Sequence, residues 1–399
     1  MTYDVERIRA LYPALQSGTV YLDGAAGTQS PDSVIEAIAG AYRRGTSNGG
    51  GFFDSSLRAD YDAAAARAAV ADLVNGDPGG VVLGPNMTTL TYRFAQTLAE
   101  TWRSGENVVL SRLDHDANVR PWVQWAQHSG VEVRWADIDL ATGELPAEQY
   151  LELVDGGTRL VAVTGASNVL GSRPDVRAIA DIAHASGALT YVDGVHSTAH
   201  GVVDVKALGA DFYATSAYKW DGPHVGAVIA APDVLEPLHP HKLASSANDV
   251  PDRFEWGTPS YHNFAGVAAA VDHLAALDDG AMGSRRDQLI TSLTSSERHE
   301  TALFSRMLAE LEADDRIILY GKAKHRTATL YFRVDGLSPD DVAKTLAAQE
   351  INVWSGHNYA WEVTGALGIR DTGSAVRASL AHYSNDDDVD RFLAAVQAL

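Results

Sequence analysis

Residues 190–226 read TYVDGVHSTAHGVVDVKALGADFYATSAYKWDGPHVG, and this stretch decides the fold. One run of β-branched and aromatic residues ends at Asp193, and a second run, DFYATS, leads into a polar turn that contains Lys219. In an open α/β sheet, ligands bind outside the carboxyl ends of the strands. We therefore expect the carboxylate of Asp193 and the amine of Lys219 to reach one crevice.

This pair of side chains suits the chemistry of pyridoxal 5'-phosphate. A lysine amine forms a Schiff base (an internal aldimine) with the cofactor aldehyde, and a carboxylate beside the pyridine nitrogen keeps the ring protonated and electron-accepting. The lysine pKa, about 10.4 in model peptides, falls when the amine is buried or lies beside another cation. Because one Asp and one Lys at strand ends are also a common coincidence, further motifs must decide.

The rest of the chain predicts two domains. Strand and helix patterns alternate from about residue 80 to 230, which indicates a largely parallel sheet covered on both faces. After residue 260 come long helices, the strand TATLYFRV, a helix from Ser338, the strands INVW and AVRASL, and a last helix from Asp386. We expect an N-terminal segment (1–20) that can pack with the small domain, a large domain (21–282) and a small α+β domain (283–399), with a hinge near Gly283.

Composition narrows the possible partners. The 399 residues include 31 Lys and Arg against 52 Asp and Glu, a net charge of -21, so we expect neither a nucleic-acid nor a membrane partner. No apolar stretch is long enough to span a bilayer and the N-terminus lacks a signal-like core, so a cytoplasmic protein is expected. The chain has no cysteine, which excludes a cysteine nucleophile. Two histidines in HPHKL (239–243) lack acidic or cysteine neighbours, so no metal site is expected.

Other polar residues stand where strands end. Thr88 and Thr89 open a helix directly after VVLG, where they could bind a phosphate at the helix N-terminus or act as ordinary N-caps. His115 follows another strand and could stack on a planar cofactor or be a simple loop residue. Asn168 ends a third strand and could hydrogen-bond a ring hydroxyl.

Eight motifs, in order and spacing, resemble the class V aminotransferase family of fold-type I pyridoxal phosphate enzymes, to which cysteine desulfurases belong. The resemblance implies a large domain with a mostly parallel seven-stranded sheet, a smaller α+β domain and pyridoxal 5'-phosphate as cofactor. It extends from about residue 20 to the end of the chain and rests on YLDGAAGTQ, MTTL, HDANVRPW, SNVLG, VDGVHST, SAYKWDGP, FEWGTPS and VRASLAHY.

The resemblance also implies roles for single residues. Lys219 resembles the Schiff-base lysine and proton carrier, and Asp193 resembles the partner of the pyridine nitrogen. His115 resembles the residue stacked on the ring, and Asn168 the one that hydrogen-bonds its hydroxyl. His196 stands near that oxygen, where desulfurases usually have Gln.

The phosphate and the substrate have their own implied partners. Arg377 resembles the arginine that binds the substrate carboxylate in a bidentate manner. Thr258 resembles the threonine that reaches the phosphate of the neighbouring subunit, which implies a homodimer. The implied phosphate cradle within the chain consists of Thr88, Ser216 and Tyr218, and Thr89 is a further cofactor-binding candidate from its place at the helix start.

The chain departs from the family at one loop. Desulfurases carry a cysteine before the strand that resembles VRASL, and the corresponding stretch here is SGHNYAWEVTGALG (355–368). Tyr359 falls near the missing thiol, with His357 close by, and both are candidate substrate-site residues. Tyr359 could shape a substrate pocket or be a plain surface aromatic. Without a cysteine the enzyme cannot carry a persulfide.

The expected function is therefore that of a pyridoxal-phosphate-dependent enzyme that removes the α-proton of an amino acid. An aminotransferase-like reaction is favoured, and β-elimination at a C–S bond or epimerisation remain alternatives because all three share this first step. A binding protein without activity is the rival from another class. Retention of Lys219, Asp193 and Arg377 together favours the enzyme.

Overall fold

The structure, a computed structural model, describes residues 3–399, so the first two residues of the expected N-terminal segment lie outside it. Its centre is a seven-stranded sheet in the order β2-β8-β7-β6-β5-β3-β4. All neighbouring pairs from β7 to β4 are parallel, whereas β8 is antiparallel to both β7 and β2. The strands are β2 (Val81–Gly84), β3 (Asn107–Ser111), β4 (Glu132–Ala136), β5 (Thr158–Thr164), β6 (Leu189–Asp193), β7 (Phe212–Ser216) and β8 (Gly226–Ile229).

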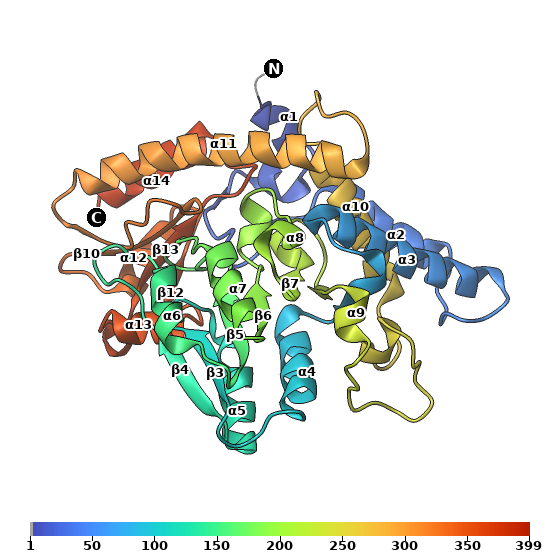
Figure 1. The fold of residues 1–399 in the computed structure, drawn as a ribbon. Helices are drawn as coiled ribbons and strands as arrows, with labels where there is room; N and C mark the ends of the chain where they lie inside the picture. The colour runs from blue at the N-terminus through green and yellow to red at the C-terminus, as the bar shows by residue number, and fades with distance from the viewer. Residues whose placement is uncertain (1–2) are drawn as a thin grey trace.

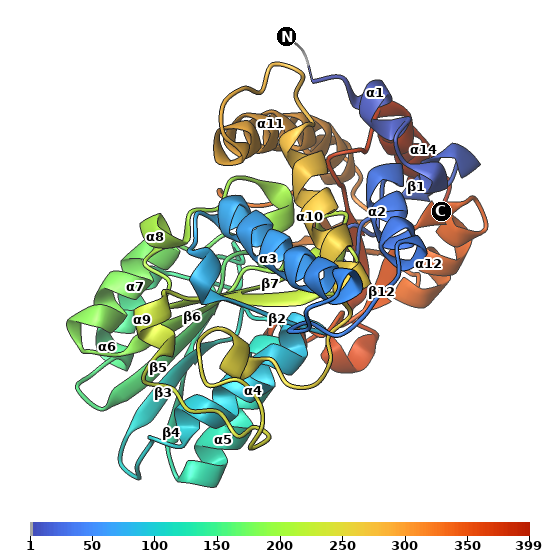
Figure 2. The same cartoon turned by 90° about the vertical axis from the view of Figure 1, so that its right-hand side faces the viewer.

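Helices cover both faces of this sheet (Figures 1 and 2). Successive residues of a strand point to opposite faces; accordingly Val108 and Leu110 of β3 join one core and Val109 joins the other. One core also contains residues of α3 (Asp54–Val74), α7 (Val176–Ala185) and α10 (Tyr261–Ala275), and the other contains residues of α4 (Met87–Ala99) and α5 (Arg120–Ser129). The expected α/β class with a mostly parallel sheet is confirmed.

The C-terminal part forms a second, antiparallel sheet in the order β12-β13-β10-β9. Its strands are β9 (Ile317–Tyr320), β10 (Thr329–Val334), β12 (Trp354–Gly356) and β13 (Ala375–Ser379). The expected single strand INVW was wrong, because the chain changes partners within it: β11 (Ile351–Asn352) pairs with β1 (Val20–Tyr21), and β12 pairs with β13. The helices around this sheet are α11 (Arg285–Glu312), α12 (Pro339–Ala347), α13 (Trp361–Ala366) and α14 (Asp386–Gln397).

The N-terminal segment contacts the end of the chain. Arg9, which ends α1 (Val5–Arg9), forms an ion pair of 2.7 Å with Asp388 of α14. Val20 of β1 belongs to the core of the C-terminal sheet. We therefore propose that this segment packs with the domain of residues 283–399, next to the large domain of residues 21–282.

The remaining α-helices of the described residues are α2 (Asp32–Arg43), α6 (Tyr150–Leu153), α8 (Val205–Leu208) and α9 (Pro232–Leu235).

Among the described residues, none of the helices is both long and apolar enough to pass through a bilayer.

Gly226, the first residue of β8, lets this strand pass directly beneath the start of α4. A Cβ added at this position would lie 2.2 Å from the backbone carbon of Asn86 and 2.4 Å from the backbone nitrogen of Met87. Those backbone atoms cannot move without displacing the N-terminus of the helix. A glycine is therefore required here by close packing.

Replacement of Gly226 by alanine should destabilise the protein by about 1–3 kcal/mol, as overpacked interiors commonly do. Urea unfolding followed by circular dichroism would measure this change. Gly156→Ala is the matched control, because nothing lies within 4 Å of a Cβ added there. Equal stability of the two variants would contradict the packing argument.

Candidate active site

A cavity of about 870 Å³ lies where the carboxyl ends of β3, β5 and β6 meet the C-terminal sheet. Both the seven-stranded sheet and the C-terminal sheet contribute residues to its wall, because Asp193 ends β6 whereas Arg377 belongs to β13. Eleven of the residues expected at a site line this cavity: Thr88, Thr89, His115, Asn168, Asp193, His196, Tyr218, Lys219, His357, Tyr359 and Arg377.

Lys219 ends the short 3-10 helix that follows β7. Its Nζ donates a hydrogen bond to the carbonyl oxygen of Ala25 and has no carboxylate within ion-pair distance among residues 3–399. Burial and the nearby Arg377 guanidinium lower the pKa of Lys219 to about 7, although the charges of Asp193 and Asp23 oppose this shift. A substantial share of the amine is therefore unprotonated and nucleophilic near neutral pH.

Asp193 is 4% exposed and faces the same cavity. Its Oδ1 accepts a hydrogen bond of 3.0 Å from the backbone N–H of Val195. Burial raises the pKa of Asp193 to about 6, while that hydrogen bond and the charge of Lys219 oppose the rise. The carboxylate is thus mostly ionised at neutral pH, and a cationic group that enters the cavity would strengthen its ionisation.

Arg377 is 4% exposed and has no carboxylate partner within ion-pair distance among the described residues. Its Nη1 donates to the carbonyl oxygen of Asn168 at 3.1 Å, and its Nε has no hydrogen-bond partner. Burial lowers the pKa of Arg377 to about 10, which leaves the guanidinium charged. A buried charge without a counter-ion is costly, so this arginine is ready to bind an anion.

His115 is in its neutral form. Burial, together with the positive charges of Lys219 and Arg377, lowers the pKa of His115 to about 3. Its Nδ1 accepts the backbone N–H of Ala117 at 3.0 Å, so the ring proton resides on Nε2. The ring lies 5.4 Å from that of Tyr359, centroid to centroid.

His196 is 4% exposed and is also neutral, because burial lowers its pKa well below the usual value. Its Nε2 lies 3.0 Å from the hydroxyls of both Thr327 and Thr329, and Thr329 belongs to β10 of the C-terminal sheet. The ring also packs edge-on against His200, with centroids 4.5 Å apart. His196 therefore joins the two sheets.

The start of α4 contributes two of the expected phosphate contacts. The N-cap is Asn86, whose Oδ1 accepts the N–H of Thr89 at 2.9 Å, so the reading of Thr88 and Thr89 as N-caps was wrong. Their side chains line the cavity instead. Ser216 does not line it: its hydroxyl accepts the N–H of Met87 at 3.0 Å and so supports the helix from behind.

The mouth of the cavity is aromatic. Tyr359 is 67% exposed and Trp354 is 51% exposed, and both line the opening together with Tyr92 and His357. Asn358 and Tyr359 have left-handed backbones, with φ of 50° and 58°. This turn directs the carbonyl oxygen of Asn358 to Asn168, whose Nδ2 donates to it at 2.8 Å. Tyr359 is thus both a surface aromatic and part of the cavity wall.

Two other residues complete the comparison with the sequence. Thr258 is exposed and lies outside the cavity of its own chain, so its assignment to a neighbouring subunit stays a prediction.

Asp23 is a residue that the sequence did not indicate. Burial raises the pKa of Asp23 to about 6, and its charge acts on both Lys219 and Arg377. Its place in the motif YLDGAAGTQ was the available signal, but a turn there was equally reasonable.

The sequence model described as "Aminotransferase class-V" matches residues 20–392. The chain belongs to this family. It is 37% identical to an uncharacterised protein of Mycobacterium tuberculosis over the full length of both, and 33% identical to a probable cysteine desulfurase of Pseudomonas aeruginosa, with 97% of this chain and 96% of that protein covered. A crystal structure of a cysteine desulfurase of Escherichia coli matches with a TM-score of 0.88 and 27% identity, covering 100% of this chain and 98% of that one. The expected fold type and, at the level of the family, the expected cofactor are confirmed.

The pKa of Lys219 leads to a prediction for the cofactor-free protein. A protonated amine cannot attack an aldehyde, so the rate of capture of pyridoxal at Lys219 should rise about tenfold per pH unit at acidic pH and level off above the pKa of about 7. Borohydride trapping and peptide mass mapping would measure this rate.

The Asp193→Asn variant is the matched control for this titration. It removes a charge that raises the pKa of Lys219, so the midpoint should move to lower pH. A midpoint near 10 in the wild-type protein would contradict the effect of burial.

Proposed function

We propose that this protein is a pyridoxal-phosphate-dependent enzyme acting on an amino acid, with Lys219 as cofactor-binding lysine and proton carrier. One observation carries the proposal: Arg377, a buried arginine without a carboxylate partner among residues 3–399, shares a cavity with a lysine whose pKa is near neutral. An amino acid brings one carboxylate and one reactive Cα–H bond, which are what these two groups require.

The residues of the cavity fit the cofactor. Asn168 Oδ1 is buried without a partner and can accept a hydrogen bond from a ring hydroxyl, with His196 beside the same part of the cavity. Asp193 would pair with the pyridine nitrogen, and the neutral ring of His115 would stack on the cofactor. Thr88, Thr89 and Tyr218 would bind the phosphate at the start of α4, where backbone N–H groups attract anions.

When bound, the cofactor supplies an electron sink for the pair released from the Cα–H bond. The protein's own side chains bind the substrate and move the proton. Arg377 holds the substrate carboxylate and so orients the Cα–H bond. Lys219 Nζ then removes the proton, a task that suits a base whose pKa lies near the working pH.

The later steps distinguish two reactions. We favour transfer of the amino group, for which Lys219 Nζ would hold the proton taken from Cα and then give it up. The alternative is β-elimination at a C–S bond, which is favoured by relatives named cysteine desulfurase. Because the chain contains no cysteine, its own side chains cannot accept the sulfur, and desulfuration through an enzyme persulfide is excluded.

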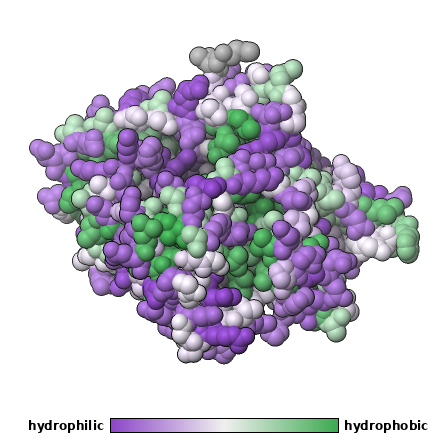
Figure 3. Space-filling model, in the orientation of Figure 1, coloured by the Kyte–Doolittle hydropathy of each residue, from purple (hydrophilic) through white to green (hydrophobic). Residues whose placement is uncertain are grey.

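We also propose that the enzyme is a cytoplasmic homodimer. The loop between α2 and α3 forms a protruding tip with hydrophobic surface (Figure 3). Phe52 is 99% exposed and Phe53 is 57% exposed, and Leu57 and Tyr61 continue this apolar surface along α3. A second copy of the chain would cover these side chains and bring its Thr258 towards the neighbouring cavity.

The proposed reaction is tested by the visible absorption spectrum of the cofactor-bound protein before and after addition of single amino acids, without a 2-oxo acid. An aminotransferase should convert the cofactor to its amine form and release the matching 2-oxo acid. A β-lyase should keep its initial spectrum and release pyruvate. Lys219→Ala should abolish turnover, and unchanged turnover in that variant would refute the proposal.

The role of Arg377 is tested by Arg377→Met. Loss of a charged, bidentate hydrogen bond should raise KM for the amino acid about 100-fold. Arg377→Lys should recover only part of this loss, because an ammonium cannot bind both carboxylate oxygens in a fixed plane. The control substrate is the corresponding amine without a carboxylate, for which wild-type and variant enzymes should have similar rates. An equal loss with that amine would contradict carboxylate binding.

A further inference from the structure

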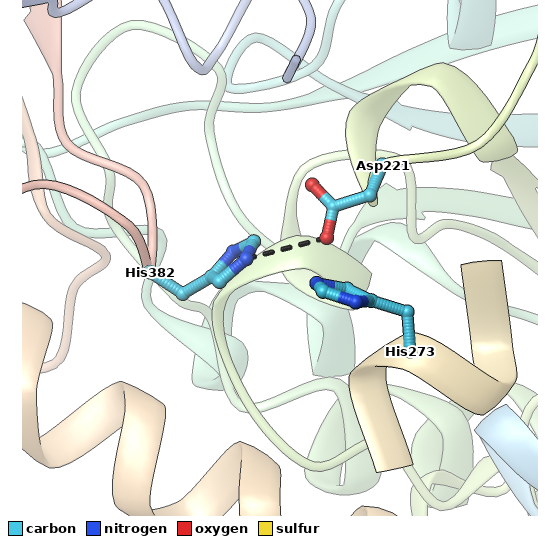
Figure 4. A group of neighbouring side chains, drawn as sticks. All are labelled: Asp221, His273 and His382. Carbon is cyan, nitrogen blue, oxygen red and sulfur yellow. Dashed lines mark ion pairs between the residues drawn. The ribbon is translucent and has the colours of Figure 1, made fainter. Parts of the chain in front are cut away.

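Four buried polar side chains from distant parts of the sequence meet behind the cavity. Figure 4 shows three of them, Asp221, His273 and His382, pointing towards one another from three separate segments. The fourth is Tyr12, whose hydroxyl lies 2.9 Å from Asp221 Oδ2, 2.7 Å from His273 Nε2 and 2.8 Å from His382 Nε2. All four side chains are at most 8% exposed. We call this group the Tyr12 cluster.

The hydrogen-bonding capacity of the Tyr12 hydroxyl matches its surroundings. The hydroxyl donates its single proton to Asp221, and its two lone pairs can accept the Nε2–H groups of His273 and His382. Burial lowers the pKa of both histidines to about 4 and raises that of Asp221 to about 6. At neutral pH the cluster is thus one carboxylate, two neutral imidazoles and one neutral hydroxyl.

This geometry argues against a metal centre. The carboxylate and the two histidines resemble a set of metal ligands, since their ligand atoms lie within 4.8 Å of one another. However, the Tyr12 hydroxyl already lies at hydrogen-bond distance from all three. Burial raises the pKa of Tyr12 well above its usual value, so the hydroxyl keeps its proton and is a poor metal ligand.

Asp221 connects the Tyr12 cluster to Lys219, two residues earlier in the chain. The backbone of Asp221 is left-handed, with φ of 69°, a conformation that most residues with a Cβ avoid and that Asp and Asn adopt more readily than the others. Among residues 3–399 its Oδ1 has no hydrogen-bond partner, and its Oδ2 accepts the hydroxyl proton of Tyr12 at 2.9 Å. Loss of the Tyr12 hydroxyl would leave a buried carboxylate poorly supported and the strained backbone free to change.

The same turn is joined to the segment that receives the lysine amine. The backbone N–H of Asp221 donates to Thr28 Oγ1 at 2.7 Å, and the N–H of Thr28 donates to the carbonyl oxygen of Tyr218 at 2.9 Å. Lys219 Nζ donates to the carbonyl oxygen of Ala25 in that segment. Movement of Asp221 would therefore disturb Tyr218, which directly precedes Lys219. It would also disturb the segment that contains Ala25, whose carbonyl oxygen accepts the hydrogen bond from the Lys219 amine.

We propose that Tyr12, acting through Asp221, is a positioning residue that holds the strained turn after Lys219 and thereby sets the position of its Nζ. This inference rests on the proposed function of Lys219. The inference also explains why an aspartate, and not a glycine, occupies this left-handed position. The carboxylate of Asp221 is needed to accept the hydrogen bond from Tyr12 that holds the turn. His273 and His382 fix the Tyr12 hydroxyl from α10 and from the segment after β13.

The test is a double-mutant cycle on the capture of pyridoxal 5'-phosphate by the cofactor-free protein, followed by visible absorption and borohydride trapping. Tyr12→Phe and Asp221→Ala should each slow capture about tenfold, the effect of losing one hydrogen bond to a charged group. If Tyr12 acts through Asp221, the double variant should also be about tenfold slower, whereas independent roles would give about 100-fold. The additive result would overturn the proposal.

Three controls separate positioning from a general loss of structure. Tyr3→Phe removes another hydroxyl of the N-terminal segment, which donates to the carbonyl oxygen of His382 at 3.1 Å, and should leave capture unchanged. Asp221→Asn keeps an acceptor and a residue that tolerates the left-handed backbone, so it should stay within about threefold of wild type. All variants are compared at a temperature at which circular dichroism shows them folded.

The remaining outcomes are also decisive. If Tyr3→Phe slows capture as much as Tyr12→Phe, the effect is one of stability and the proposal is wrong. If the purified protein holds one zinc ion per chain whose chelation slows capture, the cluster is a metal site instead. If the wild-type protein captures no cofactor, the proposed function itself fails; an additive cycle in a protein that does capture it refutes the positioning role alone.

Discussion

The central constraint on this structure is that one lysine amine must be buried and still be able to lose its proton. Lys219 meets this constraint because the guanidinium of Arg377 and the loss of solvent lower its pKa, while Asp193 and Asp23 limit the shift. Positively and negatively charged side chains must therefore both lie near the Lys219 amine. Asp23, Asp193 and Arg377 come from three regions of the sequence, so the site depends on how the two sheets meet.

The arrangement of the sheets meets this requirement. Parallel strands place their carboxyl ends at one edge, so the residues that follow β3, β5 and β6 reach the cavity without any long loop. β13 approaches from the other sheet and delivers Arg377, whose Nη1 binds the carbonyl oxygen of Asn168. The cavity thus lies between the two sheets, and a shift of one sheet relative to the other would change the distances between Arg377 and the residues that follow β3, β5 and β6.

The N-terminal segment is a third participant. It pairs β1 with β11, forms the ion pair of Arg9 with Asp388, and delivers the Tyr12 hydroxyl to the turn after Lys219. This segment therefore contacts both α14 and the turn after Lys219. Because of these contacts Tyr12 is fully buried, and its hydroxyl lies among charged and polar partners.

By itself the sequence determined the α/β class, the family and the types of chemical group in the cavity, because strand periodicity and ordered motifs are local in the chain. Lys219, Asp193, His115, Asn168 and Arg377 could all be selected in this way. Only the tertiary structure decided that INVW is divided between two sheets and that Tyr12 meets Asp221. These contacts join residues up to hundreds of positions apart, and their energies depend on burial, which no local pattern records.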